Sequence, residues 1–114
     1  MDVKRGEIWW ADLSPTRGTE QAGTRPVLVL QTDRANFRSP HTIIAPFTTR
    51  IRQSILPSHV LVSNGEGGLS EASVLLCEQI RVIDARRLVR RIGVLSAERI
   101  EEVARALRNI LDLK

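Results

Sequence analysis

The chain has few of the residues on which several common functional sites depend. Among 114 residues there is one cysteine, Cys77, and two separated histidines, His41 and His59. A single cysteine cannot form an intramolecular disulfide, and this set argues against a zinc site. Cys77 ends the apolar run of residues 74–77, so we expect a buried, unreactive thiol. The sequence predicts neither a metal nor a cofactor.

Aromatic residues and long apolar runs are also scarce. Trp9, Trp10, Phe37 and Phe47 are the only aromatics, which excludes nucleic-acid binding by stacking on many rings. No apolar run approaches the roughly 20 residues that span a bilayer, and residues 1–7 lack the apolar stretch of a signal peptide. We therefore expect no membrane segment and a cytoplasmic location.

Basic residues are abundant, and nearly all of them are arginine. Only Lys4 and Lys114 among the 17 basic residues are lysines, and the formal net charge is +4. Arginine offers a planar fork that binds phosphate oxygens in pairs, although a GC-rich genome would also enrich it. The charge favours a polyanionic partner such as nucleic acid.

Short apolar segments rich in β-branched residues predict a mainly β chain of one domain, residues 1–114. We expect Pro26 only at the start of its strand and Pro46 at an edge or a bulge. The segment 72–83 is long enough to bend across a small barrel. The expected strands are 7–13, 26–31, 42–49, 57–62, 72–83 and 89–92, with a polar connection at 32–40 and a helical turn at 84–88.

One strong helix is predicted, at the C-terminus. Ser96 can cap it, Glu98 favours its first turn, and apolar residues recur at helical spacing from Ile100 to Leu111. The fold class is therefore a small β-barrel crossed by a C-terminal α-helix.

The most informative segment is the loop of residues 18–26, Gly-Thr-Glu-Gln-Ala-Gly-Thr-Arg-Pro. Its glycines let the backbone approach a ligand, and Arg25 beside a rigid proline offers a permanent charge to a phosphate. An exposed arginine at a strand entry is the plain alternative. The segments 5–9, 12–15 and 18–30, followed by 43–48 and 76–84, resemble the MazF/PemK (Kid) toxins of bacterial toxin–antitoxin systems.

The resemblance covers essentially the whole chain in order. It implies an SH3-like barrel of the MazF, PemK and CcdB type, a homodimer, and a metal-independent endoribonuclease that cuts single-stranded mRNA at short sequences. It also implies neutralisation by a cognate antitoxin protein. The family's catalytic arginine and threonine match Arg25 and Thr48.

Metal-free RNA cleavage requires the 2′-hydroxyl to attack its own phosphate, so the charge of the phosphorane must be met. Arg25 suits that role and is a poor ordinary base; Thr48 would orient a phosphate oxygen or the 2′-hydroxyl, unless it is a routine strand-end hydroxyl. Thr19 stands where some relatives have a histidine, and their acid–base assignment cannot be carried over. Glu20 and Glu78 are candidate bases, with base recognition or an ion pair to Arg25 as alternatives.

Other polar residues are candidates for holding RNA, with a solvated surface as the alternative for each. We assign His41 and His59 to structure, and one of the two tryptophans to the core. The basic residues at 86–87 and 90–91 would extend the RNA surface, receive an acidic antitoxin segment, or form a plain solvated face. The candidate RNA-binding residues are Thr19, Glu20, Gln21, Thr49, Arg50, Glu78, Gln79 and Arg81, with Arg52 beside them.

Two rival functions follow from the sequence. A CcdB-like toxin on the same barrel would poison DNA gyrase without catalysis, and would not need the loop that carries Arg25. A non-catalytic RNA-binding module would bind RNA with steep salt dependence and cut nothing. The presence of both Arg25 and Thr48 favours the endoribonuclease.

Overall fold

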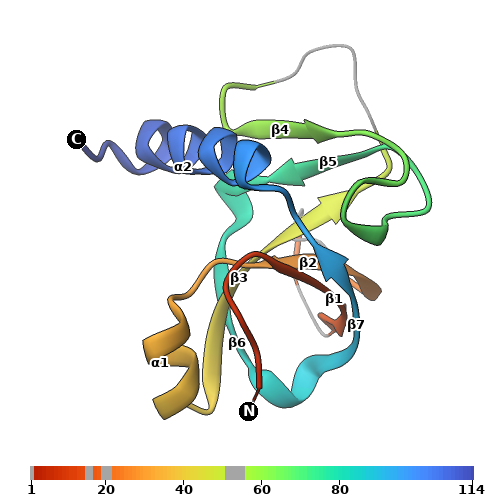
Figure 1. The fold of residues 1–114 in the computed structure, drawn as a ribbon, viewed down its shortest axis with the longest axis vertical. Helices are drawn as coiled ribbons and strands as arrows, with labels where there is room; N and C mark the ends of the chain where they lie inside the picture. Colours follow the sequence, from red (N-terminus) through yellow and green to blue (C-terminus); the bar gives the residue numbers. More distant parts are fainter. Residues whose placement is uncertain (1, 15–16, 19–21, 51–55) are drawn as a thin grey trace.

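A seven-stranded antiparallel sheet is the framework of the molecule in the computed structural model (Figure 1). The structure describes all residues except 1, 15–16, 19–21 and 51–55. The strands are β1 (Glu7–Asp12), β2 (Thr24–Val29), β3 (His41–Thr48), β4 (His59–Val62), β5 (Ser73–Leu76), β6 (Arg81–Asp84) and β7 (Leu88–Val94). The helices are α1 (Asp33–Arg38) and α2 (Ala97–Leu111), with short 3₁₀ turns η1 (Glu66–Gly68), η2 (Cys77–Gln79) and η3 (Ala85–Arg87).

Strand β3 is the centre of the sheet, whose order is β4-β5-β3-β2-β1-β7. One edge of β3 pairs with β6 over residues 41–44 and with β5 at residues 47–48, and β2 pairs with residues 44–46. The sheet therefore curls, and α2 packs against β4 and η2 (Figure 1). The prediction of a mainly β fold with a C-terminal helix is confirmed.

The prediction of one long strand over residues 72–83 is wrong. Between Leu75 and Arg81 the chain advances along β3 only from Phe47 to Ile44, so the surplus residues coil into η2. The chain thus leaves β3 and rejoins it lower down. This break places Glu78 and Gln79 in a turn rather than in a strand.

The two strand prolines lie where the sheet tolerates a missing N–H. Strand β2 begins at Thr24, so Pro26 is inside it, but β3 pairs only with Val27–Val29 and leaves that part of β2 with one neighbour. Pro46 lies on the central strand rather than at an edge, in the interval where β3 changes partner from β6 to β5.

The connection at 32–40 contains a short helix that its polar composition concealed. Thr32 caps α1 by accepting from the Ala35 N–H. The buried Asn36 accepts from Thr42 Oγ1 at 2.7 Å and from Gln31 Nε2 at 2.9 Å, which ties α1 to β3. The strong C-terminal helix forms as predicted behind the Ser96 cap.

Apolar side chains cover both faces of the sheet. One cluster joins Leu28, Phe47 and Leu75 to Val103 of α2. The other contains Val27 and Ile44, on the opposite face because neighbouring residues of a strand point to opposite sides. Trp9 packs against this second cluster, and the buried Glu7 accepts from its indole N–H at 3.1 Å.

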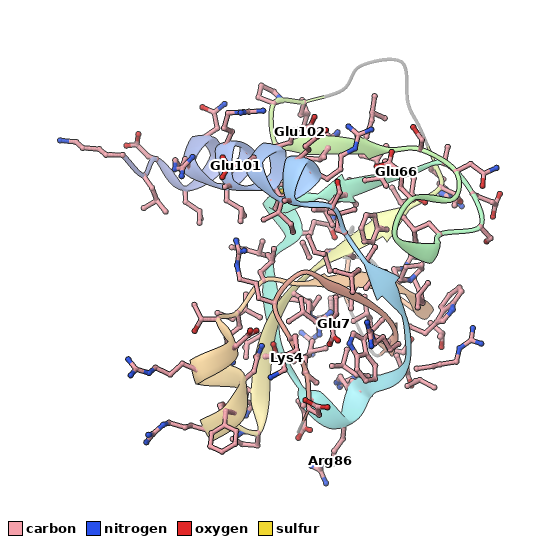
Figure 2. All side chains as sticks on the ribbon, viewed as in Figure 1. Lys4, Glu7, Glu66, Arg86, Glu101 and Glu102 are labelled. Carbon is pink, nitrogen blue, oxygen red and sulfur yellow. The ribbon has the colours of Figure 1, made fainter. Side chains whose placement is uncertain are left out.

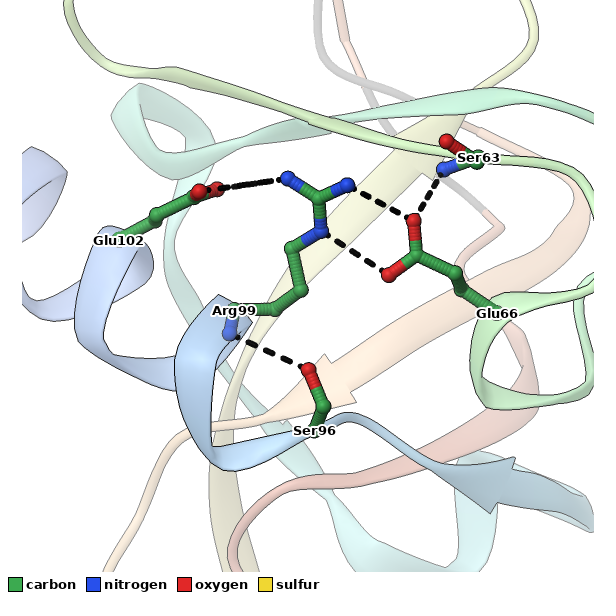
Figure 3. A network of polar contacts seen from close by, with 5 residues as sticks. All are labelled: Ser63, Glu66, Ser96, Arg99 and Glu102. Carbon is green, nitrogen blue, oxygen red and sulfur yellow. Dashed lines mark hydrogen bonds and ion pairs between the residues drawn. The ribbon is translucent and has the colours of Figure 1, made fainter.

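The turn η1, which follows β4 in the chain, contacts both β7 and α2. A Cβ atom on Gly93 of β7 would lie 2.3 Å from the carbonyl oxygen of Gly67, so only glycine permits this approach. Glu66 accepts from Arg99 Nη2 at 2.8 Å and Nε at 2.9 Å, and Arg99 also donates to Glu102 (Figure 3). Glu102 is on α2, whereas Lys4 and Glu7 lie below that helix in the view of Figure 2. None of the described helices is long and apolar enough to cross a membrane.

Candidate active site

Arg25 and Thr48 face each other across the ends of β2 and β3. Val27 is paired with Pro46, and the same register two residues further along each strand sets Arg25 opposite Thr48, on the same face of the sheet. The side chain of Arg25 confirms this approach, because its Nη1 donates to the carbonyl oxygen of Phe47 at 3.3 Å. Its Nε donates to the carbonyl of Ala22 at 2.9 Å, which holds the guanidinium at the base of the loop.

The positive charge of Arg25 is poorly compensated by the residues that the structure describes. Its hydrogen bonds there go to backbone carbonyls, and the pKa of the guanidinium is lowered from its usual value, mainly by burial and then by repulsion from Arg50. An anion bound here would relieve both effects. The arrangement suits a phosphate.

The hydroxyl of Thr48 is oriented by the backbone. Its Oγ1 accepts from the Arg50 N–H at 3.2 Å, so its own proton remains available to a ligand. Thr49 and Arg50 follow directly and are exposed. The strand end therefore presents a hydroxyl and a cation beside Arg25.

Arg81 lies on the same face of the sheet as Thr48. It is paired with Ile44, and every second residue of β3 from Ile44 to Thr48 points to that face. Its Nη1 is buried and has no hydrogen-bond partner among the described residues. A buried, unpaired guanidinium nitrogen is uncommon and calls for an acceptor. Gln79 is half-buried and has an interaction partner.

Glu78 is held by two residues from the start of β4. Its Oε1 accepts from Ser58 Oγ at 3.1 Å, and its Oε2 lies 2.9 Å from His59 Nε2. The antiparallel register of β4 and β5 brings them together by pairing His59 with Leu76. Sequence reasoning assigned His59 to structure alone and missed this contact with a candidate site residue.

The remaining residues singled out from the sequence lie outside this site or outside the part of the chain that the structure describes. Thr19, Glu20, Gln21 and Arg52 lie outside the described residues. In the basic cluster, Arg86 pairs with Asp84 at 2.9 Å, Arg91 lies 3.1 Å from Glu7, and Arg87 donates to the carbonyls of Asp12 and Ser14. These intramolecular contacts fit a solvated face, since Arg86 and Arg91 still expose 88% and 54% of their side chains. Cys77 is buried, and burial, with the charge of Glu78, raises the pKa of its thiol to about 12.

Fold and site together define a small open β-barrel with an arginine opposite a threonine at the ends of β2 and β3. A family model described as the PemK-like, MazF-like toxin of type II toxin–antitoxin systems matches residues 4–111. The chain is 46% identical over 113 residues to Endoribonuclease EndoA of Bacillus subtilis (strain 168), covering 99% of this chain and 97% of that protein. The protein belongs to the PemK-like and MazF-like toxin family.

Solved structures agree with this assignment. The Mycobacterium tuberculosis toxin MazF-mt6 is 30% identical with a TM-score of 0.80, covering 95% of this chain and 98% of that one. The MazE-MazF (Form-III) structure from Deinococcus radiodurans contains a chain 26% identical, with a TM-score of 0.79 and 98% of both chains covered. The barrel predicted from the family resemblance is thereby confirmed.

Proposed function

We propose that this protein is a cytoplasmic toxin endoribonuclease that cuts single-stranded mRNA by attack of the 2′-hydroxyl on the adjacent phosphate, without a metal ion. The observation that carries the proposal is that half-buried Arg25 lies opposite half-buried Thr48 at the ends of β2 and β3, with a guanidinium charge that the described residues leave unneutralised. The family and the name of the Bacillus relative support the same activity. Cleavage of mRNA would halt translation and growth.

Each of the two residues has a distinct part in the chemistry. The guanidinium of Arg25 binds the scissile phosphate and stabilises the additional charge of the phosphorane, and its proximity to the phosphate suits proton donation to the departing 5′-oxygen. The hydroxyl of Thr48 donates to a phosphate oxygen or orients the 2′-hydroxyl. A proton acceptor for the 2′-hydroxyl is still required; Glu20, in the loop beside Arg25, is the candidate closest in sequence.

Glu78 is better suited to recognition than to base catalysis. Two strand spacings, from β3 across β5 to β4, and two residues along β5 separate Thr48 from His59, which places their Cα atoms about 12 Å apart. Glu78 is hydrogen-bonded to His59 and so lies on the far side of this gap. We therefore assign Glu78, with Gln79, to a nucleotide next to the cut. Thr49, Arg50 and Arg81 hold flanking phosphates.

Two protein partners belong to the proposal. The MazE-MazF structure shows a relative assembled with a second protein, and the family description names a toxin–antitoxin system. A cognate antitoxin would neutralise this chain by covering the face that binds RNA. A homodimer, as the family resemblance implies, would extend that face over two copies.

The proposal is tested by mapping cleavage ends on a long single-stranded RNA in EDTA. The wild-type protein should cut at a recurring short sequence and leave a 5′-hydroxyl on one product and a cyclic or terminal phosphate on the other. Arg25→Ala should lower the rate at least 10²-fold, because it removes the main charge that stabilises the phosphorane. Arg34→Ala, which removes an exposed arginine from α1, is the matched control and should cut normally.

Either rival function would show itself in the same preparations. Capture of DNA gyrase with no RNA cleavage would favour a CcdB-like poison, and salt-dependent RNA binding without products would favour a binding module. Full activity of Arg25→Ala would overturn the proposed mechanism.

A further inference from the structure

The carboxylate of Glu78 is anchored at both oxygens before any ligand arrives. Ser58 Oγ donates to Oε1 at 3.1 Å, and His59 Nε2 lies 2.9 Å from Oε2. The histidine side chain is 14% exposed and the glutamate side chain 28% exposed, so part of the Glu78 side chain still faces solvent. A glutamate fixed in this way loses less rotamer freedom when it binds a ligand.

The backbone decides which ring nitrogen of His59 carries the proton. The N–H of Leu56 donates to Nδ1 at 3.3 Å, so Nδ1 acts as an acceptor and carries no hydrogen. The proton of a neutral ring is then on Nε2, where it donates to Glu78. His59 is thus oriented by one contact and orients Glu78 by the other.

We propose that His59 is a positioning residue that, together with Ser58, fixes the carboxylate of Glu78 for contact with an RNA nucleotide beside the cut. This inference rests on the proposed function. Thr48, Val74 and Leu61 share one row of the sheet, and Leu76 and His59 share the row two residues along, on the same face. The anchored carboxylate of Glu78 therefore lies away from Arg25 and Thr48, so it contributes to RNA binding and does not touch the reacting atoms.

This placement makes a kinetic prediction that separates His59 from Arg25. Loss of the Nε2 donor should raise KM for RNA about tenfold, the effect of one hydrogen bond to a charged group, and leave kcat nearly unchanged. Glu78→Gln should do the same and relax the preference for one base beside the cut. Because both act through one contact, the double variant should be no worse than the poorer single one.

The experiment uses a short RNA spanning the strongest mapped cut, with steady-state kinetics of the full chain. His59→Leu removes the donor at similar size, and His59→Gln returns an N–H close to the position of Nε2 and should restore KM. His41→Leu is the matched control, since His41 is exposed and lies at the other end of β3. Melting curves show whether each variant is folded, and ¹⁵N shifts of the imidazole report the Nε2–H form in the wild type.

The outcomes are distinguishable. A wild-type KM in His59→Leu, multiplied effects in the double variant, or a ring protonated at Nδ1 alone would overturn the positioning role and leave the proposed function intact. A wild-type protein that cuts no RNA would overturn both. Loss of kcat in His59→Leu, without rescue by His59→Gln, would show a structural role only.

Discussion

Arg25 and Thr48 are distant in the sequence, and each has an ordinary alternative when considered alone. Arg25 precedes a proline of a strand, and Thr48 ends a strand, a kind of element in which threonine is generally common. In the structure the two residues lie opposite each other at the ends of β2 and β3, and Arg25 reaches the Phe47 carbonyl. This proximity favours one shared site over two unrelated surface residues. Their catalytic roles remain predictions.

Thr48→Val tests the hydroxyl directly. Valine keeps the shape of the side chain, so the free energy of unfolding should fall by no more than about 1 kcal/mol, the value of one exposed hydrogen bond to the Arg50 N–H. The cleavage rate should fall roughly 10²-fold if the hydroxyl contacts the reacting groups. Rate measurements and thermal melts on the same preparation check both values, and a rate within about threefold of the wild type would exclude the catalytic role.

His59 shows what single-residue reasoning misses. A histidine in an alternating strand carries no signal for a ligand, and its partner Glu78 follows much later in the chain. The contact depends on the pairing of His59 with Leu76, which no local pattern reveals. The one local signal is that Glu78 directly follows the apolar run of residues 74–77.

Among the elements, the turn η2 has the largest functional consequence. It exists because β5 and β6 share one edge of β3 with more chain between them than that edge can hold. Local sequence favoured a continuous strand, since residues 72–83 are nearly all compatible with one. The break turns Glu78 toward β4, where Ser58 and His59 hold it.

The contact between η1 and α2 makes stability depend on pH. Hydrogen bonds from Arg99, then from the Ser63 backbone, lower the pKa of Glu66 from 4.5 to about 2. The unfolded chain therefore takes up this proton first as the pH falls, so the stabilisation is complete above about pH 4.5 and is lost toward pH 2. Glu66→Gln should be less stable than the wild type at pH 7 and nearly equal to it at pH 2.

Urea unfolding at pH 7, 4 and 2 measures this difference. Glu101→Gln, an exposed glutamate on α2, is the matched control and should unfold like the wild type at each pH. Hydrogen bonds from Arg86 also lower the pKa of Asp84, from 3.8 to about 2, but both proteins retain Asp84. The difference in stability between the wild type and Glu66→Gln therefore reports Glu66. A gap that is equally large at pH 2 would show that the ion pair does not stabilise the fold.

At the scale of the whole molecule, the charge predicts how RNA binding responds to salt. Each arginine that contacts a phosphate releases counterions, so its loss should reduce the slope of log K against log salt by about 0.7 for a single strand. In a Thr48→Val background, which should cut slowly enough for binding to be measured, Arg50→Ala should lower the slope by this amount and Arg34→Ala should not. Binding titrations from low to moderate salt check it, and equal slopes would remove Arg50 from the RNA surface.

The family resemblance predicted the barrel correctly, and the family model with the solved relatives confirms it. Periodicity and capping residues were sufficient for α2 and for most strands, because those signals are local. They failed for α1, whose cap and buried Asn36 lie in a polar stretch, and for the break at η2. Boundaries and breaks depend on which strand lies alongside, and that is a non-local property.

The sequence by itself determined the class of protein, the loop that carries Arg25 and the buried state of Cys77, because composition, order and apolar runs are written along the chain. Only the tertiary structure decided that Arg25 opposes Thr48, that most of the basic cluster is engaged internally, and that His59 and Ser58 anchor Glu78. Strand register joins residues that are remote in sequence, and a shift of one residue would turn each of them to the other face.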